Sequence, residues 1–260
     1  KLTNIITWAD LRSIHQAAEI GSTFDCLQLY NLTGCRVQHP MYPLSNILWL
    51  KRKKPEVFAK AAKFISLKEY ILFKLFGELV IDITDASTTA CFNIHSFTWD
   101  DTILKEVLEV SPDRFGQPVE CTHILKGMKS EYAAAMGISQ ETPVIVGSGD
   151  GMLANYGCGV VDDTSMPCTI GTSGALRISA GSPLLDPQQR TWCYCFTRDT
   201  WVAGGAINNG GIVLKWLRDE YRKQYEFEAE AAGIESIYAL FDRYASEIRP
   251  GCDGLVFLPF

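Results

Sequence analysis

The chain reads PVIVGSGDG over residues 143–151, and this stretch indicates its fold most clearly. Residues 142–146 predict a buried strand, and the glycine-rich backbone after them predicts that the strand breaks there. Ligands of open α/β sheets bind at the carboxyl ends of the strands. Asp150 follows such an end and precedes a helix expected over 151–156, which makes it a candidate functional residue. The alternative is that Asp150 only caps that helix, since Asp is favoured at an N-cap.

A second glycine-rich segment, TIGTSGA, occupies residues 169–175 between two predicted strands. Its glycines would let backbone N–H groups point into a concavity that suits phosphate oxygens, and Thr172 and Ser173 would add hydroxyl groups. The alternative is an ordinary hairpin with a glycine turn. It is not a Walker loop, because the chain contains no GxxxxGK[ST] pattern.

A third segment, GGAINNGG at residues 204–211, runs from a predicted strand into a predicted helix. Glycines at a helix N-terminus present free N–H groups and a favourable dipole to an anion. The alternative is tight packing of strand against helix that leaves no room for side chains.

Among the remaining elements, helices alternate with short strands in the first half of the chain, and strands predominate after residue 160. The apolar patterns predict helices at residues 10–20, 43–53, 209–221 and 234–248, with two more within 57–75. They predict strands at residues 3–8, 165–170, 175–179, 191–197, 200–203 and 255–258. This change in the type of predicted secondary structure indicates a domain boundary near residues 160–163, between domains at 1–160 and 161–260.

Composition excludes several classes of protein. The 260 residues carry a formal net charge of −6, with 47% hydrophobic and 21% charged residues, so a nucleic-acid partner is not expected. No apolar run reaches the ~20 residues of a membrane span, so no membrane partner is expected. Nine scattered cysteines without a CxxC pattern predict reduced, buried thiols in a cytosolic protein. The four histidines match no metal spacing, so no protein metal site is expected.

Together and in this order, the three glycine-rich segments resemble the ATPase core shared by sugar kinases, actin and the heat-shock ATPases. The resemblance implies an α/β, ribonuclease H-like or actin-like ATPase fold with two lobes and a cleft between them.

The chain is more specifically similar to the FGGY carbohydrate kinase family, and within it most similar to gluconate kinases. The family's landmarks are found as WADLR at 8–12, MYPLSNILWL at 41–50, DITDAS at 82–87, GD at 149–150, GTSG at 171–174, GG at 210–211 and GLVFLP at 254–259. The gluconate kinase strings are ITWAD at 6–10, HPM at 39–41, KEY at 68–70 and NNGGIVL at 208–214. Asn46 stands where the family usually has a Lys. The Trp8, His39 and Trp49 segments argue against a heat-shock ATPase without a sugar substrate.

The resemblance implies ATP-dependent phosphorylation of a sugar acid, D-gluconate to 6-phosphogluconate. The alternatives are a kinase for xylulose, ribulose or glycerol, or a non-catalytic sugar-binding protein on this fold. Asp150 would be the catalytic base, and Mg²⁺ would bridge the ATP phosphates. Residues 1–160 would then be the rest of the N-terminal sugar-binding lobe, and 161–260 the first part of the C-terminal nucleotide-binding lobe. The expected substrate-binding residues are Trp8, Asp10, Arg12, His39, Met41 and Asp150. The expected residues for ATP are Gly171, Thr172, Ser173, Gly210, Gly211 and Lys215.

Three of these assignments have structural alternatives. Arg12 could supply the cation for a substrate carboxylate or form a salt bridge on a helix surface. Trp8 could stack on a sugar or fill the core, and His39 could line the sugar site or serve the structure only.

The family begins with an Asp-x-Gly-Thr-Thr hairpin and ends with a Gly-Gly-rich adenosine-binding region, and neither occurs in this chain. We therefore expect an internal piece of a longer cytoplasmic enzyme, inactive by itself. A homodimer is left open.

Overall fold

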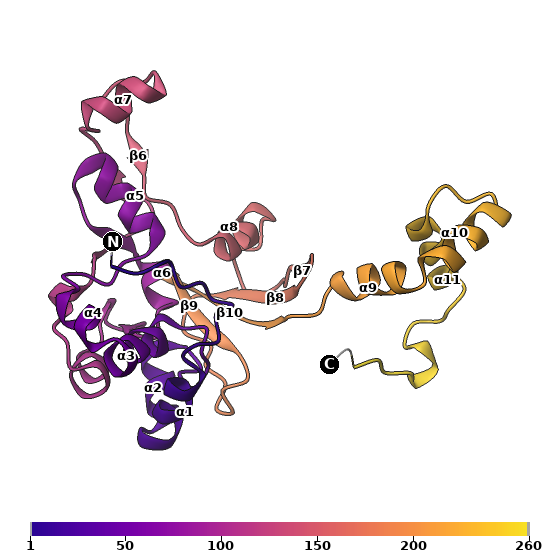
Figure 1. Ribbon diagram of the computed structural model, residues 1–260, viewed down its shortest axis with the longest axis horizontal. Coiled ribbons are helices and arrows are strands. Elements are labelled where there is room, and N and C mark those ends of the chain that lie inside the picture. Colours follow the sequence, from indigo (N-terminus) through magenta and orange to yellow (C-terminus); the bar gives the residue numbers. More distant parts are fainter. Residues whose placement is uncertain (1, 259–260) are drawn as a thin grey trace. The chain divides into compact units, whose positions relative to one another are not determined.

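The computed structural model describes residues 2–258 as a mixed α/β chain with two compact units (Figure 1). The first unit comprises the residues up to Pro167 together with Arg177–Gly205, and the second comprises Cys168–Leu176 and the residues from Ala206 onward. The chain passes from one unit to the other just before β7, between Pro167 and Cys168, and again within strands β8 and β10.

The helices of the first unit are short and end at defined residues. They are α1 Ile14–Thr23, α2 Cys26–Thr33, α3 Pro43–Lys53, α4 Pro55–Lys60, α5 Leu67–Phe76, α6 Ile83–Ser87, α7 Ser130–Met136 and α8 Asp150–Gly157. A π-helix spans Ile103–Leu108, and a 3₁₀ turn spans Pro112–Arg114. The second unit contains α9 Ile212–Glu220, α10 Arg222–Ala231, α11 Ile237–Ser246 and a 3₁₀ turn at Cys252–Gly254.

Within residues 2–258, the strands form four small sheets. They are β1 Val80–Asp82, β2 Phe92–Asn93, β3 Thr98–Trp99, β4 Gln117–Val119, β5 Ile124–Leu125, β6 Val144–Ile145, β7 Cys168–Ile170, β8 Gly174–Ala180, β9 Trp192–Thr197 and β10 Thr200–Ile207. Strands β1 and β4 pair in parallel, whereas β2 pairs with β3 and β5 with β6 in antiparallel fashion. The fourth sheet has the strand order β7-β8-β10-β9. Within the first unit, Val202 of β10 faces Tyr194 of β9.

The main core of the first unit joins helices to strands far away in the sequence. Helices α1 and α3 pack on each other, and α6 packs on β9 (Figure 1). The Tyr42 hydroxyl, at the start of α3, hydrogen-bonds the Tyr194 hydroxyl of β9 at 3.1 Å. Burial of apolar side chains is the main favourable term in this packing. It holds α6, and with it the residues described below as the candidate site, in a fixed place.

Local sequence explains where several helices begin and end. Asp25 caps α2 by accepting from the N–H groups of Leu27 and Gln28, and Gly34 ends that helix with a φ of +68°. Helix α5 begins with a capping box in which Ser66 and Glu69 bind each other's backbone. Side-chain caps thus satisfy N–H groups that would otherwise lack a partner.

Most of the predicted elements are confirmed, and α3 has the predicted bounds. The strand predicted at residues 3–8 is wrong, because the segment pairs with no strand among the described residues. It ends in a turn closed by the Asp10 N–H and the Thr7 carbonyl (3.1 Å), and Trp8 is 66% exposed. The strand predicted at 255–258 is also wrong, since these residues are exposed and unpaired within the described chain. Pro259, the last residue of the family stretch quoted above, lies outside the described residues.

Three further predictions need correction. The strand at 142–146 is only partly buried: Ile145 is 61% exposed, and Val146 is buried. The helix predicted at 209–221 is followed by α10, which the apolar pattern did not predict. The nine cysteines are free thiols, but Cys158, Cys168 and Cys252 are exposed rather than buried. Between residues 2 and 258, no helix is both long and apolar enough to cross a membrane.

Candidate active site

Asp150 is the first residue of α8, just after the glycine-rich end of β6. Gly147 has a φ of +74°, which favours glycine, and its N–H donates to the Cys121 carbonyl at 2.9 Å. This bond extends the pairing of β6 with β5 beyond the strand itself. Gly149 is then the N-cap residue of α8. The strand therefore ends where the helix begins, and Asp150 lies at that junction.

The Asp150 side chain is exposed and does not cap the helix. Its Oδ1 accepts the N–H of the adjacent Gly151 at 2.8 Å, but the N-cap position of the helix belongs to Gly149. Gly149 rather than Asp150 is therefore the N-cap residue, and a functional role for Asp150 stays a prediction. The Arg177 guanidinium lies against Gly151, the next residue, since a Cβ added there would be 3.0 Å from the Arg177 Nε.

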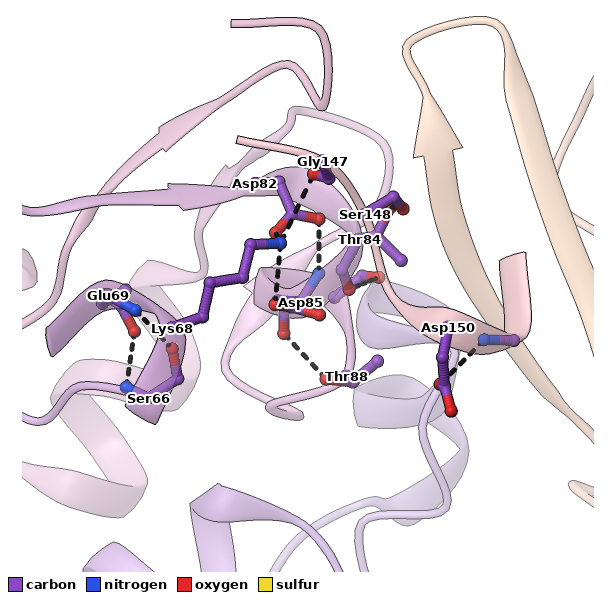
Figure 2. A network of polar contacts seen from close by, with 12 residues as sticks. Ser66, Lys68, Glu69, Asp82, Thr84, Asp85, Thr88, Gly147, Ser148 and Asp150 are labelled. Carbon is purple, nitrogen blue, oxygen red and sulfur yellow. Dashed lines mark hydrogen bonds and ion pairs between the residues drawn. The ribbon is translucent and has the colours of Figure 1, made fainter. Parts of the chain in front are cut away.

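A polar network holds the segment that precedes Asp150 (Figure 2). Its centre is the Lys68 ammonium of α5, which lies 2.5 Å from Asp82 Oδ2 and 3.2 Å from Asp85 Oδ2. The same ammonium donates to the Gly147 carbonyl at 3.3 Å. Asp82 also caps α6, because its Oδ1 accepts the Asp85 N–H at 3.1 Å. One cation thus joins α5, the start of α6 and the end of β6.

A second tether is neutral. The Ser148 hydroxyl donates to the Thr84 hydroxyl oxygen of α6 at 2.7 Å (Figure 2). Asp85 lies next to Thr84, and a Cβ added to Gly149 would be 3.5 Å from the Asp85 Oδ1. The first turn of α6 therefore lies directly against the segment that carries Asp150.

Burial and neighbouring charges shift the pKa values of two groups in this network. Burial raises the pKa of the Asp85 carboxyl to about 6, the charge of Asp82 adds to the rise, and Lys68 opposes it. Burial lowers the pKa of the Lys68 ammonium, but the hydrogen bond that it donates to Asp82 and the two carboxylate charges outweigh burial, so the net shift is upward. The Asp82 side chain is fully buried, and a buried carboxylate needs a partner of this kind.

On the predicted sugar side, Asp10 and Arg12 bind each other. The Arg12 Nε lies 2.9 Å from both Asp10 oxygens, and its Nη2 lies 2.6 Å from Oδ2. The hydrogen bonds from Arg12 lower the pKa of the Asp10 carboxyl. The guanidinium also lies 5.1 Å from the centroid of the Trp49 ring. Arg12 therefore forms a salt bridge, although the pair lies before α1 rather than on a helix surface, and its role toward a substrate stays a prediction.

Trp8, His39 and Met41 occupy three different environments. Trp8 is exposed, so the alternative that it fills the core is wrong. His39 Nδ1 accepts the Met41 N–H at 3.2 Å, and burial lowers the pKa of its imidazole. Met41 packs against the main core. The hydroxyl of Ser13 donates to the Pro40 carbonyl at 3.2 Å, which ties the segment of Arg12 to the His39 loop.

These sugar-side residues belong to two segments, 8–12 and 39–41, which the Ser13–Pro40 hydrogen bond links. Within residues 2–258, no hydrogen bond or ion pair joins any of their side chains to Asp150. Their common role therefore stays a prediction.

In the second unit, the loop at residues 171–173 is held by the start of α9. The N–H of Gly210 donates to the Thr172 carbonyl at 2.9 Å, and the N–H of Gly211 donates to the Gly171 carbonyl at 2.6 Å. A Cβ on Gly210 would lie 2.8 Å from the Ser173 carbonyl carbon and oxygen. Glycine is required here because two stretches of backbone approach each other closely.

This geometry corrects the role expected for the third glycine-rich segment. The N–H groups of Gly210 and Gly211 are not free for an anion, because the carbonyls of residues 171 and 172 already accept them. Thr172 and Ser173, by contrast, are exposed residues, and no backbone carbonyl within residues 2–258 accepts their N–H groups. The donors left for a phosphate are therefore these two N–H groups and their neighbouring hydroxyls.

The remaining nucleotide-side residue is Lys215, which lies on α9 with an exposed side chain. Within the described residues, no group of three or more His, Cys, Asp or Glu side chains could hold a metal ion. Mg²⁺ usually takes one or two carboxylates and several waters and phosphates, so the residues present fit an ion held mainly by ATP.

Lys68, Asp82 and Asp85 belong to strings typical of the family, but the sequence alone predicted no function for them. The only trace of the network in the sequence is a lysine, Lys68, followed a short way along the chain by two aspartates, Asp82 and Asp85. Only the fold shows that all three meet at the backbone that leads to Asp150.

Comparison with known proteins extends this description. Residues 1–157 match the N-terminal domain of the FGGY family of carbohydrate kinases. The chain is 40% identical over 259 residues to a gluconokinase of Bacillus subtilis, covering all of this chain and 50% of that relative. It therefore spans about half the length of the curated relatives it matches.

Two solved structures from Lactobacillus acidophilus resemble the fold closely, and each likeness covers 99% of this chain and 50% of the other. One is described as a gluconate kinase, with a TM-score of 0.88 and 36% identity. The other is described as a ligand-bound xylulose kinase, with a TM-score of 0.88 and 35% identity. The predicted α/β fold of the ribonuclease H-like, actin-like ATPase class is confirmed by these likenesses.

Proposed function

Because this chain belongs to the FGGY family of carbohydrate kinases, we propose that the full-length protein transfers the γ-phosphoryl group of ATP to D-gluconate, forming 6-phosphogluconate. The observation that carries the proposal is the position of Asp150. It is an exposed carboxylate at the junction of a strand end and a helix, and its backbone is anchored by a buried ionic network. The 40% identity to a gluconokinase supports the choice of acceptor.

In this proposal, Asp150 accepts the proton of the acceptor hydroxyl. A carboxylate is a sufficient base, because proton removal can be late in the loose transition state of phosphoryl transfer. Its main task is then to orient the hydroxyl in line with the γ-phosphate. The anchored backbone of residues 147–149 suits that task, because it leaves the carboxylate little freedom to drift.

The loop at 171–173 would hold the nucleotide phosphates through the N–H groups and hydroxyls of Thr172 and Ser173. Exposed backbone donors in a glycine-rich turn are suited to phosphate oxygens. The N–H groups of Gly210 and Gly211 would hold the loop through its carbonyl groups rather than bind the phosphates themselves. Mg²⁺, when bound with ATP, would neutralise charge on the phosphates.

Arg12 is our candidate for the gluconate carboxylate, together with the His39 loop. Arg12 already pairs with Asp10, so it offers a carboxylate only the donors that Asp10 leaves. Trp8 is exposed, so its ring is accessible for stacking on a substrate.

A xylulose kinase is the second candidate. It is favoured by the solved xylulose kinase, to which the chain is about as similar as to the gluconate kinase. Ribulose, glycerol and a non-catalytic sugar-binding role are the further alternatives. A binding protein would not need a base, so the behaviour of Asp150 separates it from a kinase.

Two measurements on the full-length enzyme test the proposal. Asp150→Asn should lower turnover by ~10² or more while nucleotide binding persists, as expected for a lost general base. The matched control is Asp101→Asn, an exposed carboxylate paired with Lys105, which should leave turnover unchanged. Turnover of Asp150→Asn within a few-fold of wild type would refute the base assignment.

The second measurement compares kcat/KM for gluconate, xylulose, ribulose and glycerol. A site built for a carboxylate leaves its donors unpaired with a neutral acceptor, so gluconate should be preferred over xylulose and glycerol by ~10² or more. Equal efficiency with a neutral sugar would refute gluconate as the substrate but leave the kinase assignment standing. A cytoplasmic location and a homodimer stay predictions from the sequence.

A further inference from the structure

The Lys68 ammonium is the point where three separate segments of the first unit meet (Figure 2). It lies 2.5 Å from Asp82 Oδ2, 3.2 Å from Asp85 Oδ2 and 3.3 Å from the Gly147 carbonyl oxygen. An ammonium has three N–H donors, and these three partners use all of them. Lys68 therefore has no donor left for a substrate.

Asp82 fixes where that ammonium lies. Its side chain is fully buried, and its other oxygen is already committed to the Asp85 N–H at the start of α6. A buried carboxylate that loses its cation is strongly destabilised, so the pair does not separate readily. The Lys68 side chain is consequently a rigid link between α6 and the Gly147 carbonyl.

The next residue is tied to the same helix. Ser148 donates to Thr84 at 2.7 Å, so two consecutive residues of the strand end are held to the start of α6. Asp150 follows two residues later and begins α8. The hydrogen bond described for its side chain runs to the adjacent Gly151 N–H, within the same helix. Its direction therefore depends on the backbone before it.

We propose that Lys68 is a positioning residue, which together with the Thr84–Ser148 hydrogen bond holds Asp150 in its working orientation. The inference rests on the proposed role of Asp150 as the base. A displacement of ~1 Å in a reacting group can cost ~10² in rate, so small movements of residues 147–149 should be visible in turnover.

The test compares Lys68→Met and Lys68→Arg in the full-length enzyme, assayed with its fastest acceptor. Lys68→Met should lower kcat by about 10- to 100-fold, while KM for acceptor and for ATP changes less than about 3-fold. Lys68→Arg keeps the charge next to Asp82 and should recover part of the loss. Lys105→Met removes an exposed lysine paired with Asp101 and should change nothing.

The decisive readout is non-additivity with Asp150→Asn. If Lys68 acts through Asp150, Lys68→Met should lower the residual turnover of Asp150→Asn by less than about 3-fold. An equal loss in both backgrounds, or a rise in acceptor KM at unchanged kcat, would overturn the inference. Where Lys68→Met does not fold, Ser148→Ala removes the neutral tether and should show the same non-additivity with a smaller loss. If Asp150→Asn itself keeps wild-type turnover, the proposed function fails first, which is a separate result.

Discussion

Substitution of Gly210 by Ala tests how the loop at residues 171–173 is held. The added Cβ would lie 2.8 Å from the carbonyl carbon and oxygen of Ser173 and 2.9 Å from the Gly171 oxygen. These atoms belong to the backbone, which cannot swing aside as a flexible side chain can. The loop and the start of α9 must therefore separate by several tenths of an ångström.

The cost follows from the contacts that this movement disturbs. Overpacking of this kind typically costs about 1–3 kcal/mol. The hydrogen bonds from the N–H groups of Gly210 and Gly211 would lengthen, and each contributes about 1 kcal/mol net. Since about 1.4 kcal/mol changes an affinity tenfold, we expect nucleotide binding to weaken by about 10- to 100-fold.

Calorimetric titration of the full-length enzyme with ADP would measure the effect. Gly205→Ala is the matched control, because a Cβ there would meet nothing within 4 Å. An unchanged nucleotide affinity in Gly210→Ala would refute the assignment of the 171–173 loop to the phosphates. A parallel loss in both variants would show that the effect does not come from the close contact.

Three further predictions concern other parts of the chain. Thr172→Val should weaken ATP binding or slow transfer with acceptor binding unchanged; unaltered nucleotide affinity and turnover would leave the loop an ordinary hairpin. Arg12→Met should raise KM for gluconate more than KM for ATP, and equal effects on both would point to a structural role for the Arg12–Asp10 pair. Burial raises the pKa of Glu69 from 4.5 to about 7, so its stabilisation is fully present below pH 4.5 and is lost as pH rises through 7. At ~1.4 kcal/mol per pH unit this amounts to roughly 3 kcal/mol, and Glu69→Gln should flatten the fall in thermal stability between pH 5 and pH 8; an unchanged slope would contradict it.

The elements that sequence patterns predicted well are those whose formation depends on local chemistry. Helix α3 starts with Pro43 and ends in a run of cations, and both signals lie within the helix itself. The strands predicted at 3–8 and 255–258 failed because a strand also needs a partner, which no local pattern reports. The start of α1 was predicted too early, because the Asp10 carboxylate binds the Arg12 N–H and holds the backbone in a turn.

In the candidate site, too, features set by the local sequence could be predicted, whereas contacts between distant residues could not. The position of Asp150 at a strand end could be predicted, because a short apolar run followed by glycines is a local signal. Its anchoring could not, since Lys68 lies 79 residues before Gly147 in the sequence and meets it only in the fold. The free N–H groups expected at Gly210 and Gly211 were wrong for a related reason, because their acceptors belong to the loop at 171–173.

The glycine-rich segments at 147–149 and 171–173 are thus held by different interactions. As a result, different residues of the sequence are constrained in the two cases. The backbone of α9 holds the 171–173 loop through hydrogen bonds that need no particular side chain but leave no room for a Cβ, so the constraint falls on the glycines themselves. The 147–149 segment is held by an ammonium and a hydroxyl from other elements, so its constraint falls on Lys68, Asp82 and Thr84. A glycine pattern can therefore reveal how the first kind of loop is held. For the second kind it reveals only that a turn exists, and the residues that hold the turn must be found among charged side chains elsewhere in the chain.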